Sequence, residues 1–270
     1  MSQRLLGSVF QRTLRDQQRA LFGFGLGLVI YVSFIAAFYP TVRAQREQFD
    51  QLIAAYPPAL RAAFGITDLG SAAGFLSAEL FSAMLPLVFL IYAIGRAADV
   101  VAGEEERGAL DVLLTHPVSR RRALAGKAGG LAVGLAALAV LLWAALAVGG
   151  FVVGMGLDLL RVAEVVLLLL LLSYAFGSIA LLLACFRGRK GSAVGASSAI
   201  AVASYLLYSF GSIVDALATV RKASPFYYYA ASPPLTATFE PAHAAVLAAL
   251  TLVATVLAFW AFERRDIGVG

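Results

Sequence analysis

The sequence predicts an all-α, polytopic integral membrane protein with about six transmembrane helices. Of its 270 residues, 61% are hydrophobic and 14% are charged, whereas soluble domains are about one half apolar and about one quarter charged. The apolar residues form long uncharged runs, and about 20 such residues can cross the hydrocarbon core as a helix. Lysine and arginine concentrate in alternate connections between these runs, as expected of a topology set by positive charge.

A basic segment precedes the first apolar run. Residues 1–19 carry four arginines, and Leu6, Phe10 and Leu14 recur among them at a spacing of four. This pattern predicts an amphipathic helix that lies on the membrane surface. No polar stretch in the chain is long enough for a soluble domain, so we predict that residues 1–270 form a single transmembrane domain.

The first three spans are expected at residues 21–39, within 71–95 and within 128–157. A polar outer loop, residues 41–70, separates the first two. Pro86 is expected to kink the second span, which neighbouring helices can tolerate by satisfying the freed carbonyl. The third stretch has 30 residues without a charge, more than one span needs, so we expect its helix to tilt or to end near Gly149.

The last three spans are expected at residues 162–186, 192–214 and 242–262. Between the fifth and the sixth, residues 216–241 form a second outer loop. It contains Tyr227, Tyr228 and Tyr229, which we expect in the aromatic belt at the outer membrane interface.

The distribution of positive charge predicts the orientation. With six spans, 15 of the 21 lysines and arginines fall on the side that holds both termini, and 6 fall on the other. Since positive charge concentrates on the cytoplasmic side, both termini are predicted to be cytoplasmic, in a cell membrane crossed several times. The net charge of +5 therefore reflects membrane topology and gives no reason to expect nucleic acid as a partner.

The sequence lacks the residues that several classes of function require. The nearest candidate for a phosphate-binding loop, Gly126-Lys127, has no glycine five residues before Gly126 and is followed by alanine, so the chain is not expected to hydrolyse ATP or to be an enzyme. The only histidines, His116 and His243, fall on opposite sides of the predicted membrane, and Cys185 is the only cysteine. We therefore expect no metal site and no catalytic dyad.

Charged residues are also scarce within the spans. Glu79, Glu164 and Asp215 lie toward outer span ends. A proton-coupled carrier needs ionisable groups near the middle of the membrane, so this pattern disfavours one. Sodium sites built from backbone carbonyls remain open.

The most informative segment connects the second and third spans, residues 96–127. It begins with acidic residues at 104–106, continues with an apolar face formed by Leu110, Leu113 and Leu114, and ends in the basic run 120–122. Pro117 ends the helix and Ser119 can cap the next one. A short cytoplasmic helix is therefore predicted between two spans. A plain solvated loop accounts for the arginines but not for the three glutamates or the leucine face.

This segment resembles the signature of ABC-2 type permeases, in which an acidic residue precedes Arg/Lys-Gly-Thr-Leu-Glu and then Leu-Leu-x-x-Pro. Here Ala109 replaces the threonine and Asp111 replaces the glutamate. The close match covers about 25 residues. The six spans and the closing run, residues 262–266, extend it more loosely over the chain.

The resemblance implies that the segment is a coupling helix that docks on a separate ATPase. The candidate docking residues are Glu104, Glu105, Glu106, Arg107, Gly108, Leu110, Asp111, Leu113, Leu114, Pro117, Ser119 and Arg120. It further implies a complex of two ATPase subunits, which bind ATP and Mg²⁺, with a second permease, identical or related, in membrane lipid. The implied activity is export, with cofactors only in the ATPase and with an unknown cargo and substrate-binding site. The alternatives are a membrane scaffold or sensor that anchors a cytoplasmic partner, and an ATP-independent channel or carrier.

Overall fold

The computed structural model of the chain describes residues 2–45, 51, 55–57, 71–108, 119–230, 235 and 238–264, but not the side chains of residues 2–8 and 215. The described residues contain helices and connections, and no strand. Within them, six helical stretches are long and apolar enough to cross a membrane. The predicted all-α, polytopic fold is therefore confirmed.

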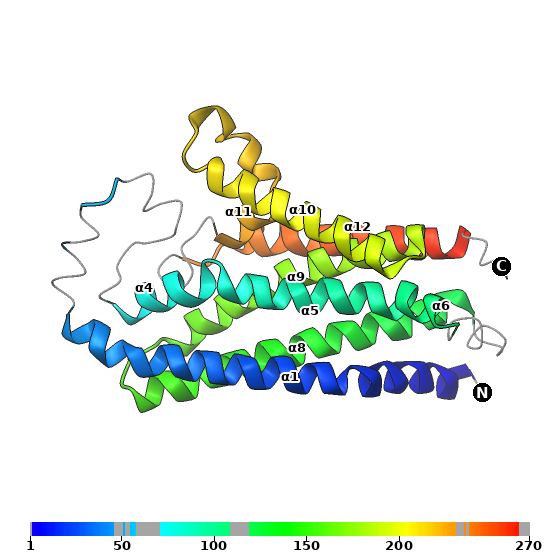
Figure 1. The fold of residues 1–270 in the computed structure, drawn as a ribbon, viewed down its shortest axis with the longest axis horizontal. Helices are drawn as coiled ribbons and strands as arrows, with labels where there is room; N and C mark the ends of the chain where they lie inside the picture. Colours follow the sequence, from blue (N-terminus) through cyan, green and yellow to red (C-terminus); the bar gives the residue numbers. More distant parts are fainter. Residues whose placement is uncertain are drawn as a thin grey trace.

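Each predicted span overlaps one long helix, and these helices are α1 (Ser2–Ala44), α5 (Met84–Ala98), α8 (Arg120–Val152), α9 (Leu159–Arg187), α10 (Lys190–Phe210) and α12 (Pro241–Arg264). The second span is assembled from pieces in the order α4 (Ala72–Leu76), the π-helix η1 (Ser77–Phe81), α5, the π-helix η2 (Asp99–Gly103) and α6 (Glu104–Glu106). The spans lie roughly side by side along one axis (Figure 1).

The N-terminal segment differs from its prediction. Residues 2–19 are helical, but they continue into the first span as the unbroken helix α1 instead of forming a separate surface helix. Thr13 and Gln17 are buried, and the Gln17 amide donates a 2.7 Å hydrogen bond to the carbonyl of Gly130 on α8. A Cβ added at Gly130 would lie 2.7 Å from the Thr13 side chain. The glycines of α8 thus allow α1 to approach closely, and the amphipathic face of α1 packs on α8.

The second span is interrupted before Pro86, as predicted. Ala83 has φ −143° and ψ −46°, outside the helical region, and α5 begins at the next residue. Proline lacks an amide donor, and its ring would collide with the carbonyl four residues earlier, which belongs to Ser82. The Ser82 hydroxyl donates to the carbonyl of Ala78 and so satisfies one of the groups near the break.

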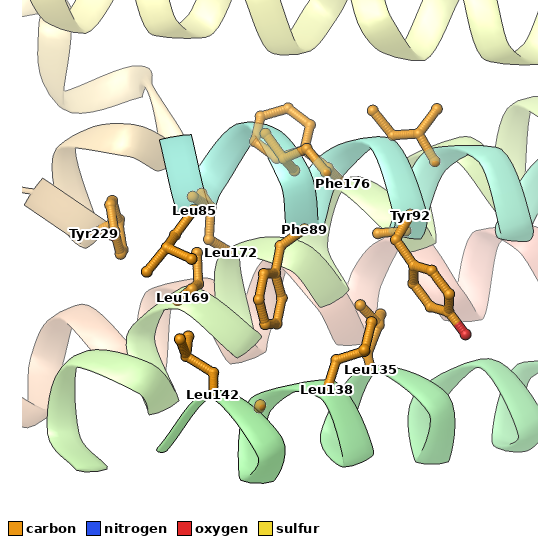
Figure 2. Close-up of a cluster of buried hydrophobic side chains, with 14 of the residues drawn as sticks. Leu85, Phe89, Tyr92, Leu135, Leu138, Leu142, Leu169, Leu172, Phe176 and Tyr229 are labelled. Carbon is orange, nitrogen blue, oxygen red and sulfur yellow. The ribbon is translucent and has the colours of Figure 1, made fainter. Parts of the chain in front are cut away.

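The core lies between α5, α8 and α9 (Figure 2). Its central side chains are Leu85, Phe89 and Tyr92 of α5, Leu135, Leu138 and Leu142 of α8, and Leu169, Leu172 and Phe176 of α9. The helix α9 is the most buried span, with 61% of its most apolar stretch inside the protein, against 17% for α10. The remaining apolar faces are exposed, as expected for helices that contact lipid.

The second outer loop folds back onto the bundle. It contains the 3₁₀ helices η3 (Asp215–Leu217) and η4 (Val220–Ala223) and the short helix α11 (Pro225–Ala230). Tyr229 is fully buried, and its hydroxyl donates a 2.7 Å hydrogen bond to the carbonyl of Phe81. Burial raises the pKa of Tyr229 well above its ordinary value. The prediction of an interfacial aromatic belt is therefore wrong for Tyr229, because the residue fills a site between helices.

Both termini lie at one end of the bundle, together with α6 (Figure 1). The connection between α9 and α10 is at the same end, since the backbone amide of Lys190 contacts the Glu106 side chain. We call this the charged end. The shared side of the termini agrees with the predicted even number of spans. The other end, which holds α4, α11 and the connection between α8 and α9, is called the opposite end.

Candidate functional site

The candidate site lies at the charged end, where the second span meets α8 and α10. The structure describes residues 96–108 and 119–127 of the segment that the sequence singles out. Five predicted docking residues, Leu110, Asp111, Leu113, Leu114 and Pro117, lie outside the described residues. Ser119 and Arg120 mark the start of α8. Ser119 occupies the predicted capping position, but its side chain makes no capping hydrogen bond.

The second span continues into the candidate site without a break. Helix α5 ends at Ala98, η2 follows at once from Asp99, and α6 follows from Glu104 to Glu106. The first described part of the predicted coupling helix is therefore an extension of the span. A π-helix holds one extra residue in its turn and is often found at functional sites.

Asp99 is the central residue of the site. Its carboxylate accepts hydrogen bonds from Lys190 Nζ at 2.7 Å, Arg107 Nη1 at 3.0 Å and Arg96 Nη1 at 3.0 Å. Its side chain is only 15% exposed. Charge-assisted hydrogen bonds of this kind are shorter and stronger than neutral ones. One carboxylate thus joins α5, the end of α6 and the start of α10.

A second ion pair connects α6 with α8. Lys127 is 1% exposed, and its ammonium group donates 2.5 Å hydrogen bonds to Glu104 Oε2 and to the carbonyl of Val100. A buried ammonium is tolerated only when it is paired and hydrogen-bonded. Lys127 therefore fixes the position of Glu104 relative to α8.

Glu106 binds the start of α10. Its Oε1 accepts a 2.9 Å hydrogen bond from the backbone amide of Lys190, the first residue of that helix. A carboxylate at this place satisfies an amide that has no partner within the helix and favours the positive end of the helix dipole. Nearby, hydrogen bonding to Asp99 raises the pKa of Arg107 above its ordinary value.

Gly103 leaves room for these contacts. A Cβ at this position would lie 2.4 Å from Asp99 Oδ1 and 3.2 Å from Lys190 Cδ. The first distance is shorter than any ordinary contact. A larger residue would displace either the carboxylate or the lysine stem, so the site depends on glycine here.

A polar pocket of about 310 Å³ lies beside Asp99. Its lining residues come from α1 and from the second span with its extension, and they are Arg12, Thr13, Asp16, Arg96, Asp99, Val100, Glu104 and Arg107. Charges of both signs face it. Arg96 Nε, in its wall, is buried and makes no hydrogen bond within the described part of the chain.

The structure brings together some of the predicted residues and adds others. Glu104, Glu106 and Arg107 converge, but each contacts another residue of this chain. Asp99, Lys127 and Lys190 were not predicted as site residues, because each stands near a span end where charge is ordinarily a topology signal. Lys127 lies in Gly126-Lys127, a pair that follows the matching segment in the sequence and that was considered only as a phosphate-binding loop. In the described residues, no cluster of three or more histidine, cysteine or acidic side chains is suited to a metal.

Comparison with known proteins identifies a family. Residues 8–267 match the family described as ABC-2 family transporter protein. The match includes all six spans and the charged end. No curated protein sequence matches the chain.

Proposed function

The chain belongs to the ABC-2 family of transporter proteins, and from this membership we propose that it is the permease subunit of an ATP-driven exporter whose ATPase is a separate polypeptide. As a member of this family with six apolar helices, it is a multi-pass transmembrane transporter protein. The resemblance to ABC-2 type permeases implies export, which supports the proposed direction of transport.

The proposed contact with the ATPase is the segment from Glu104 to Arg120. One observation carries this assignment: α5 runs through η2 into α6 without a break, and α6 is fastened to α8 by Lys127 and to α10 by Lys190. If the docking segment were a flexible, solvated coil, movement of the ATPase would deform the coil and would not reach the spans. A helix that is fixed to three spans can transmit the closing movement of an ATPase to the membrane domain.

The proposed complex contains two ATPase subunits and two permeases, either two copies of this chain or this chain with a related one. The ATPase subunits bind ATP and Mg²⁺, and this chain binds neither. The cargo crosses the membrane between the two permeases, which open inward and then outward. This arrangement rests on family membership and on the absence of a phosphate-binding loop from the sequence.

Co-purification tests the proposal. Tagged chain is co-expressed with candidate ABC ATPases from the same genome and extracted in detergent, and ATP hydrolysis of the purified material is measured. We expect a stable complex that hydrolyses ATP. Folded chain that binds no ATPase contradicts the proposal and favours a scaffold or a channel.

A double variant tests the docking segment. Glu105→Lys with Leu113→Glu reverses a charge and places a carboxylate on the predicted leucine face, so association with the ATPase is expected to be lost while membrane insertion is kept. The control is Arg43→Glu, a charge reversal of the same size as Glu105→Lys and of opposite sign, in the last turn of α1 and far from the docking segment. Retained association of the double variant would rule out this docking segment.

A further inference from the structure

The helix α10 is the least buried of the six described spans. Only 17% of its most apolar stretch lies inside the protein. Gly191 and Gly195 face open space, with no atom within 4 Å of a Cβ added at either. A helix with few buried contacts along its length has little to hold it against its neighbours. The attachments at its two ends therefore decide where α10 lies.

Among the described residues, Lys190 makes the hydrogen bonds that attach the charged end of α10 to the second span and its extension. Its ammonium group lies 2.7 Å from Asp99 Oδ1, and its backbone amide lies 2.9 Å from Glu106 Oε1. At the opposite end, Ser224 Oγ donates to the carbonyl of Ser204 at 2.7 Å, and the Tyr208 hydroxyl donates to the carbonyl of Ala230 at 3.2 Å. The two ends thus differ in kind: the charged end attaches α10 to the second span, and the other attaches it to an outer loop.

We propose that Lys190 and Asp99 form the joint through which movement of α6 reaches α10, so that η2, α6 and the start of α10 move as one body. This inference rests on the proposed function, because it names the path by which docking of an ATPase would reach a span. Lys190 acts as a positioning residue, because it orients α10 through Asp99.

The joint is built to be stiff. The Asp99 carboxylate is held from one side by Arg96 and from the other by Arg107, and it is 15% exposed. Exposed ion pairs contribute little because water screens them and the side chains are free to turn. Here the carboxylate has three cationic partners and little freedom, so its bond to Lys190 holds a defined geometry.

A competing attachment makes a different prediction. Gly188 and Arg189 alone separate α10 from α9, and Gly188 takes a left-handed conformation with φ 61°. If this short link positioned α10, the helix would follow α9, the most buried span. Removal of the Lys190 ammonium would then leave the position of α10 unchanged.

The first experiment uses the chain alone. Spin labels are placed at the exposed residues Val140 of α8 and Val202 of α10, in a Cys185→Ala background. The labelled chain, diluted with unlabelled chain in lipid nanodiscs, gives the distance between the two helices. Lys190→Ala is expected to broaden the distance distribution, whereas Lys190→Arg, which keeps a cation, is expected to leave it narrow.

Arg187→Ala is the matched control. It removes a cation from the same connection, and the contact that it removes, with Ser192, ties α10 to α9 and not to the second span. Its distance distribution is expected to match that of the parent chain. Gly103→Ala provides a second route to the same joint, because the added methyl displaces Asp99 or Lys190, and it is expected to broaden the distribution as well.

The second experiment adds the ATPase and traps it with ATP and vanadate. We expect trapping to shift the mean distance in the parent, in Lys190→Arg and in Arg187→Ala. In Lys190→Ala the shift is expected to be lost while co-purification and ATP hydrolysis are retained. A purely structural role of Lys190 would reduce expression and hydrolysis together and would leave any remaining shift intact.

The outcomes separate the two proposals. An unchanged distribution and a retained shift in Lys190→Ala overturn the joint, even if the complex forms and hydrolyses ATP. Failure of every variant and of the parent to bind an ATPase overturns the proposed function. In that case broadening by Lys190→Ala in the chain alone still supports the attachment of α10 through Asp99.

Discussion

The two ends of the bundle are fastened by different interactions. At the charged end, Asp99 and Glu104 pair with cations from α8, α10 and the end of α6. At the opposite end, the fully buried Tyr229 donates to the carbonyl of Phe81, and Asp158 caps the start of α9. One end relies on ion pairs and the other on aromatic packing and local hydrogen bonds.

The difference has a physical consequence for movement. Buried packing is close to a single arrangement, since any shift opens a void. At the charged end, ion pairs and one backbone hydrogen bond join the extension of the second span to α8 and α10, so a displacement of α6 would carry these helix ends with it. We therefore expect the opposite end to act as the fixed end of the bundle and the charged end as the end that responds to a partner.

The largest effect is expected from Lys127→Ala. The substitution removes the partner of Glu104 and leaves a partly buried carboxylate without its cation, a loss of about 3 kcal/mol of folding stability. The measurement is the thermal unfolding midpoint of the purified chain in detergent. Lys127→Met combined with Glu104→Gln removes both charges and is expected to recover most of the loss. Equal midpoints for Lys127→Ala and the parent would show that the pair contributes no stability.

Gly130→Val tests the close approach of α1 and α8. Its side chain would overlap Thr13, and overpacking of this kind costs about 2 kcal/mol. The same substitution at Gly23 is the control, because a Cβ there meets no atom within 4 Å. We expect a lower unfolding midpoint for Gly130→Val only. Similar midpoints for the two variants would contradict the observed packing of residues 9–17 on α8.

Tyr229→Phe sharpens the comparison at the opposite end. It keeps the ring and removes the hydrogen bond to the carbonyl of Phe81, so we expect a loss of about 1 kcal/mol. Since the other end is untouched, association with the ATPase should be unchanged. Tyr227→Phe, at a half-buried tyrosine of the same helix, serves as the control in the unfolding measurement. If the unfolding midpoint of Tyr229→Phe is no lower than that of Tyr227→Phe, the hydrogen bond to Phe81 does not stabilise the fold.

The smallest effect is expected from Glu263→Gln. Glu263 forms a bidentate ion pair with Arg121 at the charged end, but the Arg121 side chain is 73% exposed. Exposed pairs contribute little to stability. We expect no measurable change in the unfolding midpoint. If Glu263→Gln lowered the unfolding midpoint as much as Lys127→Ala does, solvent exposure would not explain how much each ion pair at the charged end contributes to stability.

Much of the fold could be predicted from the sequence. Uncharged runs located the six spans, and charge placed both termini on one side, because a span must be apolar and its ends are marked by arginine and lysine. Pro86 marked the break in the second span, since its ring excludes a regular helix before it. The family signature at residues 104–120 pointed to the charged end as the candidate site.

Pairing between distant residues could not be predicted in this way. Lys127 and Lys190 look like ordinary topology signals in the sequence, and only the tertiary structure brings them to Glu104 and Asp99. The outer tyrosines were expected at an interface, but the chain folds back and buries Tyr229.

The sequence by itself determined that the chain is helical, that it crosses the membrane and which segments cross, because these depend on composition over some 20 neighbouring residues. Only the tertiary structure decided which helices touch and which charges pair. Those contacts depend on how separate helices are turned and shifted against one another, as the closeness of Gly130 to Thr13 and the buried pair of Lys127 with Glu104 show.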